Sequence, residues 1–219
     1  MSKNINRVFC HRKSGASYVV RSIMANYYCN DFDKNHWHFS DSMVKAIADS
    51  DIALYVVRDG RDVLYDCYEY WKQQPGTKKH FEGKTFRQYI MGYIEAYSDK
   101  DLFEKTAETK NPLDPRMFSD PVQYWVDHVQ GFINSNLEKM YFVNYDMMLI
   151  DGAAMLMHIG DYFKLEPRNK LIEPLEDLTL YKPLFKDVGV WRLVFGQKDL
   201  EYFWGRAEDT MIKLKFSYN

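Results

Sequence analysis

The sequence predicts an α/β fold in which a mainly parallel central sheet is flanked by helices. Two short apolar runs, residues 8–10 and 52–57, are each followed by charged residues. The second is a continuous run of six apolar residues, which is typical of a parallel strand buried on both faces. Helically spaced apolar residues follow each run, at 17–28 and 62–72. Strands that alternate with helices in this way favour a parallel sheet.

The rest of the chain continues the alternation. Residues 140–144 form another strand candidate, and further helical patterns cover 41–48, 85–96, 121–133, 151–163 and 198–213. Residues 73–81 and 98–120 hold most of the polar and turn-forming residues, which indicates surface excursions instead of linkers. We therefore expect one domain over residues 1–219, with 73–120 supplying a lid or acceptor-side surface.

Composition excludes several classes of protein. The 219 residues are 46% hydrophobic and 16% aromatic, which excludes a disordered or low-complexity chain. The 29 Lys and Arg against 31 Asp and Glu give a net charge of −2, which disfavours general nucleic-acid binding. Three cysteines without a C-x-x-C pair predict neither a disulfide framework nor a zinc site. With no signal peptide or long apolar segment to be read, we expect a cytoplasmic protein without membrane contact.

The loop that follows the first strand has the composition of an anion cradle. Residues 11–17 read H-R-K-S-G-A-S and lead into the first helix. Gly15 allows close backbone approach, the amides at the helix start point toward an anion, and Lys13 adds a charge. The nucleotide motif G-x-x-x-x-G-K-[ST] is absent because Lys precedes Gly here. A polar turn with a solvated Lys remains an equal interpretation of this loop alone.

Arg58 follows the second strand, within the segment V-R-D-G-R-D-V at 57–63. Ligands of parallel sheets bind beyond the carboxyl ends of the strands, so Arg58 and Lys13 can converge on one multiply charged anion. A guanidinium fork suits a phosphate monoester. The alternative is local pairing of Arg58 and Arg61 with Asp59 and Asp62, which we favour for Arg61.

Taken together, these residues resemble the sulfotransferases that use 3′-phosphoadenosine 5′-phosphosulfate (PAPS). K-S-G-A-S-Y at 13–18 is similar to the family's phosphosulfate loop P-K-S-G-T-T-W, with Arg12 in place of Pro. V-V-R-D-G-R-D-V at 56–63 resembles its 3′-phosphate segment. The other similar segments, in family order, are K-N-H at 34–36, W-V-D-H-V at 125–129, N-Y-D-M-M at 144–148, V-G-V-W-R at 188–192 and D-L-E-Y-F at 199–203.

The resemblance implies an enzyme that transfers a sulfuryl group by in-line attack, with PAPS as donor, PAP as product and no metal. It implies that Lys13 binds the phosphate oxygens and stabilises the leaving group, and that His36 is the catalytic base. A histidine suits that role because its ordinary pKa lies near neutral pH. Arg58 would bind the 3′-phosphate. The remaining implied donor-binding residues are Arg12, Ser14, Gly15, Ala16, Ser17, Tyr18, Asp66, Tyr145, Lys186, Trp191 and Arg192, with Tyr18 and Tyr145 against adenine. His38 is a competing base, and His128 is expected to pack on its helix.

The sequence departs from the family at two positions. Asp66 stands where the family has a Ser, and a carboxylate repels the phosphate that a Ser would bind. The C-terminal R-K-G is replaced by Leu184, Phe185 and Lys186, so that Lys182 or Lys186 would have to substitute. We expect PAPS still to bind, mainly through Lys13, the loop amides and Arg58.

Two other functions remain open from the sequence. One is a small nucleotide or metabolite kinase that uses the same anion loop, although no convincing magnesium-binding Asp follows a strand. The other is a non-catalytic phosphoadenosine-binding protein, which Asp66 and the missing R-K-G favour. The acceptor is expected to be a small molecule, a glycan or a peptide, and neither its identity nor the oligomeric state follows from the sequence.

Overall fold

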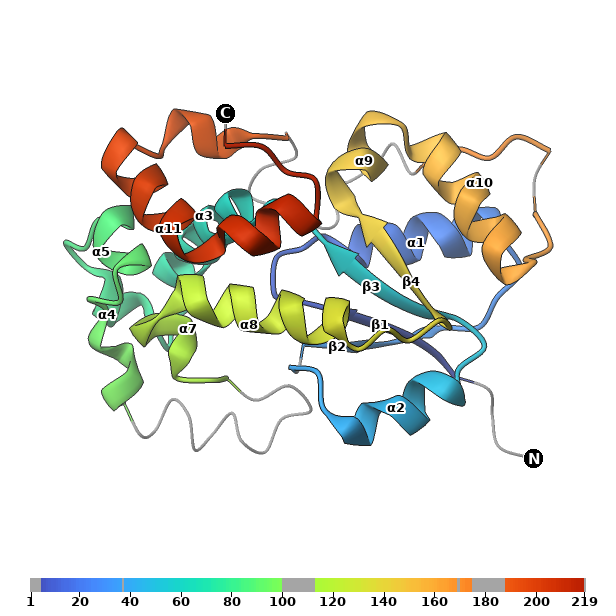
Figure 1. Ribbon diagram of the computed structural model, residues 1–219, viewed down its shortest axis with the longest axis horizontal. Coiled ribbons are helices and arrows are strands. Elements are labelled where there is room, and N and C mark those ends of the chain that lie inside the picture. The colour runs from blue at the N-terminus through green and yellow to red at the C-terminus, as the bar shows by residue number, and fades with distance from the viewer. Residues whose placement is uncertain (1–4, 37, 100–112, 169, 175–187, 219) are drawn as a thin grey trace. The chain divides into compact units, whose positions relative to one another are not determined.

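Figure 1 shows the computed structural model of the chain, which describes residues 5–36, 38–99, 113–168, 170–174 and 188–218. The chain divides into two compact units. Unit 1 consists of Met1–Arg58 and Gly131–Pro183, and unit 2 of Asp59–Gln130 and Leu184–Asn219. The expectation of a single domain over the whole chain stays a prediction.

Unit 1 is built on a four-stranded, all-parallel sheet, which confirms the predicted fold class. Its strands are β1 (Asn6–Cys10), β2 (Phe32–Asn35), β3 (Ala53–Val57) and β4 (Met140–Asn144), in the order β2-β1-β3-β4. Phe9 lies opposite both Asn35 and Tyr55, and Val57 lies opposite Asn144. The carboxyl ends of all four strands therefore meet at one edge of the sheet.

Helices cover both faces of this sheet (Figure 1). On one face, Val8, Leu54 and Val143 belong to one apolar core with side chains of α1 (Ala16–Asn26), α9 (Tyr145–Ile150) and α10 (Gly152–Phe163). On the other face, Phe132 in the last turn of α8 (Pro121–Asn134) stacks on Tyr55 at 4.4 Å between ring centroids. The helix α2 (Asp41–Ala48) joins that face through Ala46, whose carbonyl accepts a hydrogen bond from Arg7. Successive strand residues point to opposite faces of the sheet, so each strand contributes side chains to the packing on both faces.

The strand β2 was missed by the sequence prediction. Its residues, F-D-K-N, are mostly polar, and no strand was assigned to them from the sequence. A strand at the end of a sheet needs apolar side chains less than a central one, because its outer side stays open. The central strand β3 is fully buried, and its apolar run was correctly predicted.

Unit 2 is helical in its described residues. Its long helices are α3 (Gly60–Gln73), most of α8 and α11 (Gln197–Lys213), and its short elements are α4 (Lys78–Phe81), α5 (Phe86–Ile90), η1 (Glu95–Ser98), α7 (Arg116–Ser119) and η2 (Val190–Leu193). Aromatic side chains form much of its core; Trp71, for example, packs on Phe118 at 5.4 Å. His128 is fully buried on α8, as expected of a packing residue.

The helix expected over residues 85–96 is in fact interrupted. The helix α5 ends at Ile90, and Gly92 takes a left-handed backbone with φ of 77°. Gly92 N–H donates to Tyr89 O and Tyr93 N–H to Gln88 O, which is the hydrogen-bond pattern of a glycine-terminated helix. A Cβ at position 92 would overlap the Ser119 carbonyl, so the backbone there requires glycine.

Candidate functional site

The loop between β1 and α1 has two residues in the left-handed region. Gly15 has φ of 85° and Lys13 has φ of 67°. For Lys13 this conformation is unusual, because residues with a Cβ seldom adopt it. A Cβ on Gly15 would overlap the ring of Tyr145, the first residue of α9. Glycine is therefore required at position 15 both for its backbone conformation and for the close approach of the Tyr145 ring.

The start of α1 presents unused hydrogen-bond donors. Tyr18 and Val19 N–H both donate to the Gly15 carbonyl, and Ser14 N–H donates to His11 O at 3.3 Å. Within the described part of the chain, no acceptor meets the N–H groups of Gly15, Ala16 and Ser17, and no side chain caps the helix. Adjacent donors of this kind at the N-terminus of an eleven-residue helix favour an anion.

One cationic side chain lies at the start of α1, and two more cationic residues precede it in the loop. Lys34, on β2, donates to the Ser17 hydroxyl at 3.0 Å and so holds its ammonium at the first turn of α1. Lys13 and Arg12 precede the helix and are half-buried. Because Lys34 and the loop come from neighbouring strands, the sheet itself brings the positive charge to the helix start.

His36 lies beside this loop, directly after β2. Its Nδ1 is 3.0 Å from Cys10 O and 3.2 Å from Cys10 Sγ. A carbonyl only accepts, so Nδ1 carries the proton and Nε2 is left with its lone pair. Burial, and then the charge of Arg12, lower the pKa of His36 from 6.5 to about 4. His36 is therefore neutral at pH 7, with a pKa further from neutral pH than we expected.

The sequence predicted no role in the site for Cys10 and His11, yet both are buried next to His36. Burial raises the pKa of the Cys10 thiol to about 12, so this side chain stays protonated. Burial also lowers the pKa of His11 to about 3, and its Nδ1 donates to the Arg12 carbonyl at 2.8 Å. No sequence pattern marks either one, because each is an ordinary strand-end residue. His38, the competing base, is half-buried.

Arg58 meets the loop from the end of β3. Its Nη1 donates to the Lys13 carbonyl at 3.3 Å, and its Nε lies 4.0 Å from Asp146 Oδ1. The guanidinium also lies over the Tyr145 ring, 5.3 Å from its centroid. Arg58 therefore meets Lys13 at its backbone carbonyl. The predicted convergence of the two side chains on one anion stays a prediction. Asp146 was missed, since an acidic residue at a helix start is usually explained by the helix dipole.

The two tyrosines expected against adenine both belong to the core of unit 1. Tyr145 is 1% exposed and Tyr18 is 9% exposed, and their rings meet edge to face at 6.0 Å. The Tyr145 ring also covers Gly15. A stacking role for either ring stays a prediction.

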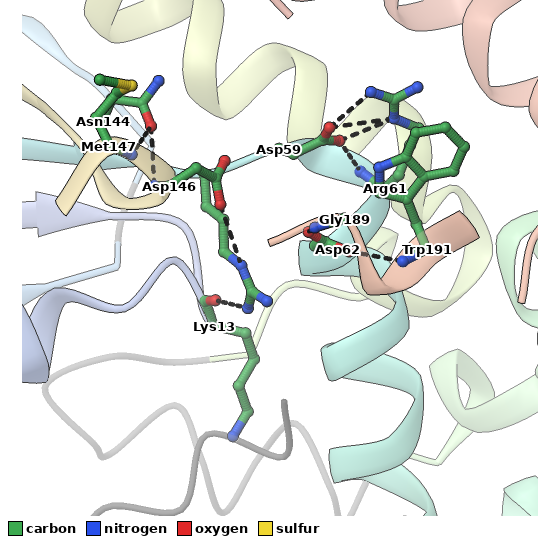
Figure 2. A network of polar contacts seen from close by, with 10 residues as sticks. Lys13, Asp59, Arg61, Asp62, Asn144, Asp146, Met147, Gly189 and Trp191 are labelled. Carbon is green, nitrogen blue, oxygen red and sulfur yellow. Dashed lines mark hydrogen bonds and ion pairs between the residues drawn. The ribbon is translucent and has the colours of Figure 1, made fainter. Parts of the chain in front are cut away.

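In unit 2, Arg61 is held locally, as the alternative interpretation predicted. It bonds Asp59 through Nε and Nη2, and its Nη groups donate to the Ser217 and Tyr218 carbonyls. The guanidinium stacks 3.6 Å from the centre of the Trp191 ring. Figure 2 shows the Asp59 carboxylate reaching Arg61 in this way.

Asp62 holds the backbone of the C-terminal segment in the same unit. Its two carboxylate oxygens accept from Gly189 N–H and Trp191 N–H, each at 2.8 Å (Figure 2). Trp191 is buried, and the exposed Arg192 lies over its ring at 4.6 Å. The two aspartates that follow the arginines of the R-D-G-R-D segment therefore organise unit 2 itself.

Asp66 and Lys186 complete the predicted set. Asp66 is 2% exposed on α3, in unit 2, whereas Arg58 belongs to unit 1. Its expected effect on a 3′-phosphate stays a prediction. Lys186, like Lys182, lies outside the described residues.

The described residues offer neither a metal-binding cluster nor a membrane-spanning helix. They contain no group of three or more His, Cys, Asp or Glu side chains placed to hold a metal ion. None of the helices they form is long and apolar enough to cross a membrane.

A cavity of about 430 Å³ lies elsewhere in unit 1, at the amino ends of β1 and β3. The side chains of Asn6, Ile52 and Arg168 line it with neighbouring residues. It is at the opposite end of the strands from Lys13 and His36, so it is separate from the candidate site.

Comparisons with known proteins identify the fold. No family model and no curated protein sequence matches the chain. Among solved structures, it is similar to mouse sulfotransferase SULT7A1 complexed with PAP, with a TM-score of 0.61 and 13% sequence identity. The match covers 96% of this chain and 85% of the mouse chain. The chain therefore has a sulfotransferase-like α/β fold.

Proposed function

We propose that the chain is a sulfotransferase that moves the sulfuryl group of PAPS to a hydroxyl or amine of an acceptor. The observation that carries the proposal is the pairing, at one sheet edge, of an anion cradle with a histidine. The cradle is the start of α1, where the amides of Gly15 and Ser17 meet no acceptor among the residues that the structure describes, and the histidine is His36. The similarity in fold to a PAP-bound sulfotransferase supports the same function.

The cradle fits the 5′-phosphosulfate end of the donor. The amides of Gly15, Ala16 and Ser17 would bind phosphate oxygens, and Lys13 would neutralise the charge that develops on the leaving phosphate. Lys34, fixed on Ser17, adds a second cation near the same anion. When bound, PAPS would supply an activated sulfuryl group on a phosphate leaving group.

His36 would accept the acceptor's proton at Nε2. The bond from Nδ1 to the Cys10 carbonyl fixes the tautomer that leaves Nε2 free of a proton. The pKa of about 4 keeps the ring neutral at physiological pH, although a base of low pKa contributes less driving force to proton transfer. Activity should therefore fall on acidification near pH 4 and not near 6.5.

The 3′-phosphate end fits less well. Arg58 is the implied ligand, but its guanidinium already lies near Asp146 and donates to the Lys13 carbonyl. Charge on Arg58 that is shared with a carboxylate is less available to a phosphate. This observation favours a second candidate, a phosphoadenosine-binding protein without transfer activity.

Transfer of radiolabelled sulfate from PAPS to panels of phenols, alcohols, amines, glycans and peptides tests the proposal. We expect labelled product with wild type, and losses of at least about 100-fold with His36→Ala, in the range of removing a general base. The matched control is His158→Ala, an exposed position on α10, which should leave transfer unchanged.

Two outcomes would count against the proposal. Binding of PAP with no transfer to any acceptor class would favour the binding protein. Unaltered transfer by His36→Ala would remove His36 as the base, and His38→Ala would then be tested in the same assay.

A further inference from the structure

Lys13, which the proposed function places on the donor phosphate, has an unusual backbone. Its φ of 67° lies in the left-handed region, which residues other than glycine, Asn and Asp seldom adopt. Such a conformation persists only where neighbouring groups hold it, and it often marks a functional site. Some contact must therefore stabilise this backbone.

Among the described residues, one contact with the Lys13 backbone comes from Arg58. The guanidinium donates from Nη1 to the Lys13 carbonyl at 3.3 Å. Arg58 is only 1% exposed, so the bond is shielded from water. In Figure 2 the Lys13 carbonyl points into the polar network, while its side chain leads away from it. A held carbonyl thus fixes the direction in which the Lys13 side chain starts.

Arg58 in turn is placed by α9. Asp146, in the first turn of that helix, puts Oδ1 4.0 Å from Arg58 Nε, and its side chain is 5% exposed. Asp146 is fixed because its own N–H donates to the Asn144 side chain, which caps the helix (Figure 2). The Tyr145 ring lies beside the guanidinium on this helix and also covers Gly15. One helix start therefore contacts both the arginine and the loop.

We propose that Asp146 is a positioning residue, which holds Arg58 on the Lys13 carbonyl and so keeps Lys13 directed at the donor's 5′-phosphate. The inference rests on the proposed function for its ligand. It gives Asp146 a role opposite to the simplest alternative, in which the carboxylate merely competes with a 3′-phosphate for Arg58. The two roles predict opposite effects of removing the charge.

The test compares two nucleotides on Asp146→Asn, with Asp161→Asn, an exposed site on α10, as the matched control. Calorimetry measures the dissociation constants of adenosine 5′-phosphate and of PAP. We expect Asp146→Asn to weaken both by the same factor, about tenfold, which corresponds to about 1.4 kcal/mol. Asp146→Glu, which keeps the charge, should recover most of the affinity. Unchanged affinities, or tighter PAP with unchanged adenosine 5′-phosphate, would overturn the inference.

Removing one partner of a buried ion pair can unfold a protein, so a second variant is included. Arg58→Met combined with Asp146→Leu replaces the pair by apolar side chains, so that neither partner is left as an unpaired buried charge. We expect it to fold and to bind adenosine 5′-phosphate about tenfold more weakly than wild type. Because Arg58 is not expected to touch the 5′-phosphate, such a loss would come from the lost positioning of Lys13. Wild-type affinity in this variant would overturn the inference.

A ligand-independent measurement separates this inference from the proposed function. Ser14 directly follows Lys13, and its amide donates to His11 O. Hydrogen exchange of this amide therefore reports the loop conformation. Exchange should be faster in Asp146→Asn than in Asp161→Asn, and equal rates would contradict the positioning role. If wild type binds neither nucleotide, the proposed function fails, while the exchange rates still decide on Asp146.

Discussion

Stability should depend on pH through His11. The ring is 3% exposed, and burial lowers its pKa from 6.5 to about 3. Between these values the unfolded chain binds a proton that the folded chain does not, so stability is complete above pH 6.5 and is lost as pH falls toward 3. From pH 7 to pH 5 the loss from this one group is about 2 kcal/mol at about 1.4 kcal/mol per pKa unit.

The substitution His11→Asn isolates this effect. The Asn amide can donate to the Arg12 carbonyl as Nδ1 does, and it does not titrate. Urea unfolding at pH 7 and pH 5 should show wild type losing about 2 kcal/mol more than His11→Asn. The control is His158→Asn, on the exposed side of α10. Equal losses in wild type and His11→Asn would refute the assignment of His11 as a neutral buried group.

Three further predictions follow from the geometry. Gly15→Ala should destabilise the fold by about 2–4 kcal/mol, from the left-handed backbone and the overlap with the Tyr145 ring, as measured by urea unfolding; a loss below about 1 kcal/mol would contradict the close approach. Asp62→Asn replaces one of the two acceptor oxygens by a donor and should lower the free energy of unfolding by about 1–3 kcal/mol. Hydrogen exchange of the Gly189 amide should be faster than in wild type, and an unchanged exchange rate would contradict this prediction. The rate of sulfuryl transfer should titrate with an apparent pKa of about 4 in a pH–rate profile, and a midpoint near 6.5 would show that His36 is solvated.

Much of the fold could be predicted because periodicity reports burial. The central strand β3 and the helices α2 and α10 were predicted to within one residue, since apolar runs and helical spacing mark them directly. The strand β2 was missed because an end strand has little apolar signal. The break at Gly92 was missed because it depends on the Ser119 backbone, which is distant in sequence.

The candidate site shows a similar division. Lys13, Arg58 and His36 were proposed from motif and spacing, and the structure places all three at one sheet edge, while their roles stay predictions. Asp146 was not found, because its importance comes from a contact with Arg58 across 88 positions of sequence (146 − 58). The pKa of His36 also escaped prediction, since burial sets it and no local pattern does. Long-range contacts and desolvation therefore account for most of what the sequence left open.

The central claim is that the cradle at α1 holds a phosphoadenosine donor. The most direct test is the change in melting temperature with PAP, measured against ADP with magnesium. Binding to the native state at 100 times the dissociation constant adds about 2.7 kcal/mol of stability. The proposed function predicts an increase with PAP and none with ADP and magnesium. An increase with ADP and magnesium alone would contradict it and place a kinase first.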